Sequence, residues 1–177
     1  TFKKWLSDPN MGPYGSNANG CLMRIGFIPS LPLDKANSIS LALDCTNITH
    51  NSAEAQQCVI DFIELCFSLK ATRSKESLRK YLKKHSFEHT VKSLRDRKLF
   101  SMGCFETLCI AVVCVLFSSN FEEVLLNCLN VGGDTDTIAV VALNIAQQIY
   151  PVNTDFLNFS MAVIQKQSND LFNEINS

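Results

Sequence analysis

The sequence of 177 residues lacks an excess of charge of either sign, because 16 lysines and arginines face 17 aspartates and glutamates and the formal net charge is −1. This balance argues against partners that need a strongly charged surface, such as nucleic acids and anionic membranes. Long hydrophobic runs are also missing: the longest, Leu108 to Phe117, is about half as long as a membrane-spanning helix requires. The N-terminus has no hydrophobic region of the signal-peptide kind. We therefore expect a soluble, cytoplasmic monomer that binds no nucleic acid and does not insert into membranes.

Cys-x-x-Cys pairs are absent although the chain has eight cysteines, which excludes a zinc knuckle and a thioredoxin-type redox pair. Most of the cysteines stand at apolar positions of helix-like segments. We expect them to be reduced core residues of a protein from a reducing compartment rather than partners in disulfides.

Strand-like runs bounded by turns, internal repeats and low-complexity segments are missing as well. Residues 1–33 hold four of the five prolines and four of the seven glycines and read as loop, apart from a short helix near Trp5. Beyond them, apolar residues recur at spacings of three and four, as on one face of a helix. The pattern predicts helices from residue 34, from Ser52, within the charged stretch 70–97, over 105–117, after Asn120, over 135–149 and over 154–175. The charged stretch is expected to hold one helix followed by a solvated, less regular segment. We expect an all-α, compact single domain over residues 1–177.

Polar residues that stand just before these helices predict where the helices begin. The candidate caps are Asn51 with Glu54, Ser74, and Asn120 with Glu123. The helix over 105–117 is apolar on nearly every side and should lie at the centre of the core. The final helix collects apolar residues on one face: Phe156, Phe159, Val163 and Ile164.

The segment VGGDTDTIAV, Val131 to Val140, places two carboxylates and two threonines behind a pair of glycines. One interpretation is structural, with Asp134 as a helix cap and Asp136 in the first turn. One cap is enough, however, and a second acid beside the apolar run Ile138 to Leu143 costs solvation if it is buried. Carboxylates and a hydroxyl at one helix start suit a hard cation such as magnesium, or the hydroxyls of a sugar.

Two further segments have both a structural and a functional interpretation. GPYGSNANGCLMR, residues 12–24, carries glycines 12, 15 and 20, whose backbone freedom would allow exposed amides to bind phosphate. Taken alone, the segment is more typical of an ordinary surface loop. His50, in CTNITHN, stands at a helix boundary, where a histidine commonly makes structural hydrogen bonds.

Three segments, in this order, resemble the ADP-ribosylglycohydrolase family, whose type example is the dinitrogenase-reductase-activating glycohydrolase. YGSNANGCLMRIGFIP (Tyr14–Pro29) is similar to that family's Gly-Asn-Gly-x-x-Met-Arg segment, CTNITHNSAEA (Cys45–Ala55) to its Thr-His turn, and VGGDTDTIA (Val131–Ala139) matches its most diagnostic motif without a change. The resemblance spans about residues 1–150. It implies a truncated form of that family's fold, because nothing in the chain matches the Gly-Asp-Ala opening and Asp-Asp-Thr segment that supply the family's other metal ligands. Ala18 also replaces a usual glycine.

The resemblance implies a hydrolase that cleaves the glycosidic bond joining ADP-ribose to a protein side chain, with arginine as the expected side chain. It makes Asp134 and Asp136 catalytic and, together with Thr137, ligands of magnesium, of which we expect one ion or none. It assigns to ADP-ribose binding a further set of residues: Gly15, Ser16, Asn17, Asn19, Gly20, Met23, His50 and Gly133.

Two other functions stay open at this point. The chain could bind ADP-ribose or a modified protein without cleavage, or it could be one fragment of a larger hydrolase. We favour the hydrolase because tandem acids beside an apolar helix cost stability unless they have a role. A site for binding alone would not need two carboxylates, which repel a diphosphate.

Overall fold

The computed structural model describes the backbone of residues 2–97 and 101–175, with side chains as far as Asn169 in the last helix. Within these ranges the chain is all-helical, which confirms the predicted fold class, and its one β-type contact is an isolated bridge between Ala18 and Gly103. The helices are α1 (Phe2–Ser7), α2 (Gly20–Met23), the 3-10 helix η1 (Ile28–Ser30), α3 (Lys35–Asn47), α4 (Ala53–Thr72), α5 (Glu76–Lys84), α6 (Val91–Arg97), α7 (Cys104–Leu116), α8 (Phe121–Val131), α9 (Thr135–Ala146) and α10 (Thr154–Ile175). That residues 1–177 form a single domain stays a prediction.

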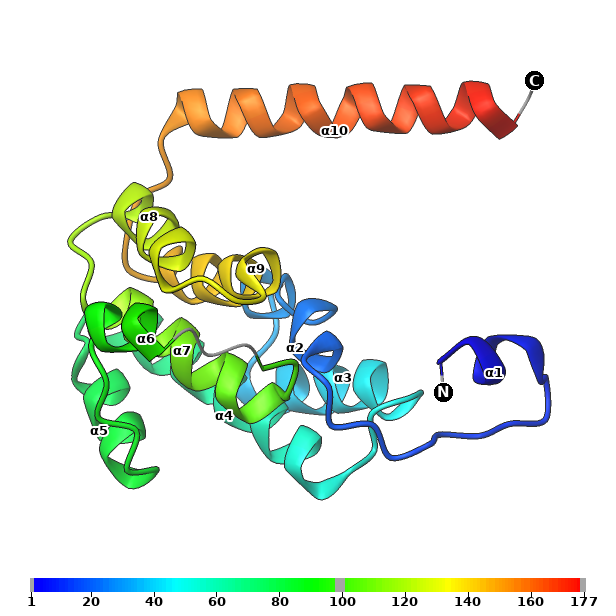
Figure 1. The fold of residues 1–177 in the computed structure, drawn as a ribbon, viewed down its shortest axis with the longest axis horizontal. Helices are drawn as coiled ribbons and strands as arrows, with labels where there is room; N and C mark the ends of the chain where they lie inside the picture. The colour runs from blue at the N-terminus through cyan, green and yellow to red at the C-terminus, as the bar shows by residue number, and fades with distance from the viewer. Residues whose placement is uncertain (1, 98–100, 176–177) are drawn as a thin grey trace.

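Helix α7 forms the centre of the core, as its composition predicts. Ten of its 13 residues are buried, and α9, α4, α5 and α8 pack around it. Figure 1 shows α4, α6 and α9 surrounding it. A helix that is apolar on every side can bury its whole surface only in this way.

The helix starts confirm one predicted cap and correct two others. The Asn120 side chain accepts a hydrogen bond from the Glu123 amide at 2.8 Å, as predicted. At α4 the cap is Ser52 rather than Asn51, since the Ser52 hydroxyl accepts from the Ala55 amide at 3.2 Å. The carboxamide of Asn51 instead accepts from the Gly15 amide at 2.8 Å, a contact that only the tertiary fold provides.

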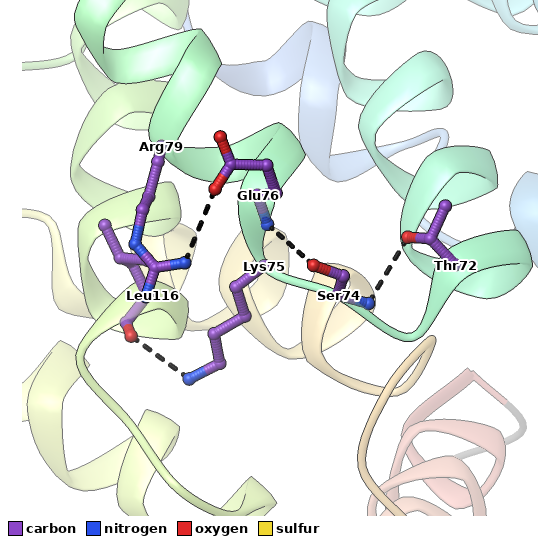
Figure 2. Close-up of polar contacts among 6 residues, drawn as sticks. All are labelled: Thr72, Ser74, Lys75, Glu76, Arg79 and Leu116. Atoms are coloured by element: carbon purple, nitrogen blue, oxygen red, sulfur yellow. Dashed lines mark hydrogen bonds and ion pairs between the residues drawn. The ribbon is translucent and has the colours of Figure 1, made fainter.

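Ser74 is not the residue that begins α5, although it assists there. The N-cap position is Lys75, and the Ser74 hydroxyl accepts a longer bond, 3.3 Å, from the Glu76 amide (Figure 2). The Lys75 ammonium reaches across to the end of α7 and donates to the carbonyl oxygens of Leu116, at 3.1 Å, and of Ser118. A cation at this place satisfies carbonyls that the helix end leaves without partners.

Three other boundary predictions are wrong. Residues 20–23 and 91–97 are helical (α2 and α6) where a loop and a less regular segment were predicted. Helix α9 ends at Ala146, three residues before the predicted end, because the chain continues from there in tighter turns.

The terminal helices contribute little to the core. In Figure 1, α1 and α10 stand away from the other helices. Phe156 packs its ring edge-on against Phe121 of α8, with the ring centroids 5.6 Å apart. The other apolar residues predicted on this face, Phe159, Val163 and Ile164, are exposed. The predicted apolar face of α10 therefore exists but lies largely in solvent.

The eight cysteines are all free, and seven of them are buried, which agrees with their predicted place in the core. Across the part of the chain that the structure describes, no helix combines the length and the apolar character needed to cross a lipid bilayer.

Candidate functional site

The segment from Gly15 to Gly20, here called the glycine loop, is held against the start of α7. The Asn19 amide donates to the Met102 carbonyl at 2.8 Å, and the Cys104 amide donates to the Asn17 carbonyl at 2.9 Å. Gly15 adopts a φ of 68°, in the left-handed region that favours glycine. The loop therefore has one defined path, which leads Asn19 into the protein.

Most backbone amides of this loop already have protein acceptors, which corrects the predicted phosphate-binding nest. Gly15 donates to Asn51, Ser16 to the Thr49 carbonyl at 3.3 Å, and Ala18 to the Ser16 hydroxyl at 3.3 Å. The amides of Asn17 and Gly20 donate to no residue that the structure describes. An amide that is engaged within the protein cannot also grip an anion, so at most a small part of the loop is free to do so.

The side chain of Asn19 connects the glycine loop to the tandem acids. Its Nδ2 atom donates to Oδ2 of Asp134 at 2.6 Å and to the Thr107 hydroxyl at 3.3 Å. Asn19 is 5% exposed, so both donors of the amide are used where water is largely absent. Residues 115 positions apart in the sequence thus meet at a short, charge-assisted hydrogen bond.

Asp134 does not cap α9, although it stands at the N-cap position. Its carboxylate accepts no backbone hydrogen bond from the first turn of the helix and is directed to Asn19 instead. Gly132 and Gly133 precede it with φ values of 74° and 77°, a turn that other residues rarely adopt. The predicted capping role of the Asp134 side chain is therefore wrong.

The other two residues of the motif have opposite surroundings. Asp136 is exposed, and its carboxylate forms no hydrogen bond or ion pair with a residue in the described ranges. Thr137 is 4% exposed, and its hydroxyl donates to the Met23 sulfur at 3.5 Å. This contact brings Met23, predicted to line the site, to the start of α9.

His50 lies beside Gly20, the first residue of α2. Its Nδ1 atom is 2.7 Å from the Thr49 hydroxyl, and a Cβ added at Gly20 would come 3.5 Å from its Nε2 atom. Burial, followed by the nearby Arg24 charge, lowers the pKa of His50, so the imidazole is neutral near pH 7. The imidazole therefore borders the glycine loop at the residue next to Asn19.

The described residues offer too few acidic side chains for a pair of magnesium ions. No group of three or more His, Cys, Asp or Glu side chains capable of holding a metal occurs among the described residues. Magnesium prefers six oxygen ligands but commonly takes only one or two carboxylates and keeps several waters. Asp134, Asp136 and Thr137 remain the predicted ligands of a single ion, and a two-ion site would require further acids.

Two cavities lie elsewhere and share no residue with this site. One, of about 290 Å³, is lined by residues such as Leu82, Phe87 and Phe117. The other, also about 290 Å³, is lined by residues such as Asp61 and Tyr81. The candidate site is therefore defined by its hydrogen bonds rather than by either cavity.

The structure also adds residues that the motif analysis did not assign to the site. Thr107 binds Asn19 from the largely apolar α7, and a lone hydroxyl in such a run is the signal that could have identified it. Arg24, within the quoted glycine-rich segment, donates to the Thr49 hydroxyl at 3.1 Å. Nothing in the sequence pattern shows that Arg24 and His50 share a partner.

Fold and site together define an all-helical protein in which a glycine-rich loop meets tandem acids at the start of a buried helix. A family model described as ADP-ribosylglycohydrolase matches residues 1–150, and the chain belongs to this family.

The fold agrees with this assignment. A solved structure titled "ADP-ribosylglycohydrolase-related protein complex" superimposes with a TM-score of 0.60 at 23% sequence identity, and the match covers 84% of this chain and 56% of that chain. The present chain thus spans little more than half the length of that relative. A comparison with curated proteins gave no match.

Proposed function

We propose that this protein hydrolyses the glycosidic bond between ADP-ribose and a modified protein side chain, with arginine as the side chain. The observation that supports this most directly is the 2.6 Å hydrogen bond from Asn19 to Asp134. It joins two segments that resemble the family's motifs, and it orients one carboxylate while the other stays free in solvent.

The two aspartates have different roles in this proposal. Asp134 is held by Asn19 through one oxygen, so its second oxygen is oriented to accept hydrogen bonds from ribose hydroxyls. Asp136 is exposed and free of partners in the described ranges, so it can accept a proton from water. The water oxygen then bonds to the anomeric carbon, the bond to the side-chain nitrogen breaks, and that nitrogen takes up a proton.

The remaining residues bind the nucleotide. The amide of Asn17 is free of acceptors among the described residues, and we assign it to the diphosphate. Gly15 and Ser16 shape the loop, since their amides are engaged. Gly20, Met23, His50 and Gly133 border the same region. One magnesium ion, when bound by Asp134, Asp136 and Thr137, would draw electron density from the oxygens that it contacts.

The test is a product assay. The protein is incubated with ADP-ribosylated arginine, ADP-ribosylserine and an ADP-ribosylated protein, and free ADP-ribose is measured by mass spectrometry. We expect release from arginine, and we expect Asp134→Asn and Asp136→Asn each to abolish it while the circular dichroism spectrum stays unchanged. The matched control is Asp44→Asn, which removes an exposed acid from α3 outside the site. Repetition with a chelator tests the metal.

Other outcomes separate the alternatives. Unchanged turnover in both aspartate variants would eliminate this mechanism. Calorimetric binding of ADP-ribose without product would identify a binding protein rather than an enzyme. If the protein neither binds ADP-ribose nor releases product, this chain alone lacks the proposed function.

A further inference from the structure

The structure links Arg24, Thr49 and His50 by hydrogen bonds that determine which nitrogen of the imidazole carries its proton. We propose that Arg24 and Thr49 are positioning residues that hold His50 as the Nε2–H tautomer, so that the imidazole offers a hydrogen-bond donor to an acceptor oxygen of the bound nucleotide. The tautomer follows from the structure alone, and the identity of the acceptor rests on the proposed function.

The first step is the direction of the hydrogen bonds from Arg24. A guanidinium can only donate. Its Nε atom donates to the Gly20 carbonyl at 3.2 Å, and Nη1 donates to the Thr49 hydroxyl oxygen at 3.1 Å and to the Cys45 carbonyl at 3.4 Å. Three acceptors thus place the guanidinium in one orientation, in which the Thr49 oxygen is an acceptor toward Arg24.

The second step is the single proton of the Thr49 hydroxyl. Thr49 is 1% exposed, so water does not readily serve as its partner. The only acceptor within hydrogen-bond distance of this hydroxyl, among the residues that the structure describes, is Nδ1 of His50 at 2.7 Å. The hydroxyl therefore donates to Nδ1, because the reverse direction would leave a buried hydroxyl proton without an acceptor.

The third step follows from the chemistry of a neutral imidazole, in which one nitrogen accepts and the other donates. Since Nδ1 accepts, Nε2 carries the proton. Burial and the Arg24 charge both lower the pKa of His50, which agrees with a neutral ring. The Nε2 atom makes no hydrogen bond to a described residue and lies beside Gly20, the neighbour of Asn19.

The glycine at position 20 also affects the access of a ligand to the Nε2 atom of His50. A methyl group there would sit 3.5 Å from Nε2, in ordinary van der Waals contact, and would cover the nitrogen. Glycine at this place leaves the N–H open toward the glycine loop. A ligand atom that meets it must be an acceptor, such as a hydroxyl, carbonyl or phosphate oxygen of ADP-ribose.

The test of the tautomer is a long-range proton–nitrogen NMR spectrum of protein labelled with ¹⁵N-histidine. The chain has 3 histidines, so loss of one set of signals in His50→Gln assigns the ring. We expect the wild-type ring to carry its proton on Nε2 at about pH 7.5. Thr49→Val should let both tautomers appear, and Thr49→Ser, which keeps the hydroxyl, should restore the wild-type pattern. A wild-type proton on Nδ1, or a Thr49→Val spectrum identical to wild type, would overturn the proposal.

The wild-type spectrum alone decides the tautomer if Thr49→Val fails to fold. The second arm measures the affinity for ADP-ribose by calorimetry, where Thr49→Val should weaken binding about tenfold and Thr49→Ser should recover it. Equal affinities in all three proteins would overturn the claim that the His50 Nε2–H donates to the nucleotide. If the wild-type protein does not bind ADP-ribose, both the proposed function and the hydrogen bond from His50 to the nucleotide are overturned. The NMR result still decides whether Thr49 sets the tautomer of His50.

Discussion

Replacing Asn19 by aspartate tests the contact on which the site depends. The substitution keeps the shape of the side chain but turns the donor that lies 2.6 Å from the Asp134 carboxylate into a second carboxylate. Loss of a hydrogen bond to a charged group costs about 1.5–3 kcal/mol. Repulsion between the two acids adds about 1–2 kcal/mol, a reduced figure because Asp134 is partly exposed and solvent screens it. We expect Asn19→Asp to lower the free energy of unfolding by about 2.5–5 kcal/mol at about pH 7.5.

The pH dependence of this variant gives a sharper test. Two adjacent carboxylates share a proton, so the folded-state pKa of the pair lies above that of the unfolded chain. A group with a raised folded-state pKa contributes stability when it is protonated and loses it as the pH rises. The deficit of Asn19→Asp relative to wild type should therefore shrink as the pH falls from about 7.5 to about 5.

Urea unfolding followed by circular dichroism measures both quantities. The matched control is Asn17→Asp, which adds the same charge at an exposed position of the same loop, and its effect should stay within about 0.5 kcal/mol. If Asn19→Asp were as stable as Asn17→Asp, or if its deficit were the same at both pH values, Asn19 would not hold Asp134 in solution.

Three further changes probe the surroundings of the site. A Cβ at Gly26 would come 2.7 Å from Cγ of Asn144, so Gly26→Ala should lower the free energy of unfolding, measured with urea, by about 1–3 kcal/mol. Adding Asn144→Ala to the same chain should recover part of this loss. If the effects of the two substitutions were purely additive, the clash would be refuted. Because burial and the Arg24 charge lower the pKa of His50, the unfolded chain takes up a proton below about pH 6.5 that the folded chain does not. The melting temperature of wild type should thus fall more steeply between about pH 7.5 and 5.5 than that of His50→Gln, and parallel curves would contradict this. Lys75→Met removes the hydrogen bonds to the end of α7 and should lower the free energy of unfolding by about 1–3 kcal/mol. The control Lys80→Met, at an exposed position of α5, should change it by less than about 0.5 kcal/mol. Equal effects of the two substitutions would argue against a role for the Lys75 ammonium.

Elements were predictable where a local pattern specifies them. The cap at Asn120 and the burial of α7 follow from residues within one or two turns of each other. The short helix α2 was missed because its four residues carry no periodic signal, and its first turn follows Asn19, whose amide is bonded to the distant Met102 carbonyl. Ser52 rather than Asn51 caps α4 because Asn51 has a better-placed partner in Gly15, 36 residues away.

The candidate site was also predictable only in part. Its motifs are visible in the chain, and the unusual turn at Gly132 and Gly133 agrees with what two glycines permit. Which amides are free to bind a phosphate, however, depends on residues from other segments. The Thr49 carbonyl and the Asn51 side chain accept hydrogen bonds from two amides of the glycine loop. The pattern marks Thr107 only as a lone hydroxyl in a largely apolar run, and its contact with Asn19, which also binds Asp134, comes from the tertiary fold.

The amino-acid sequence by itself determined the all-helical class, the positions of the main helices and the motifs that indicate the family, because periodicity, caps and motifs are properties of neighbouring residues. Only the tertiary structure decided that Asp134 turns to Asn19 instead of capping its helix, that Asp136 stays in solvent, and that Arg24 acts on His50 through Thr49. These outcomes depend on how α2, α7 and α9 pack, and packing sums many weak contacts between residues far apart in the chain.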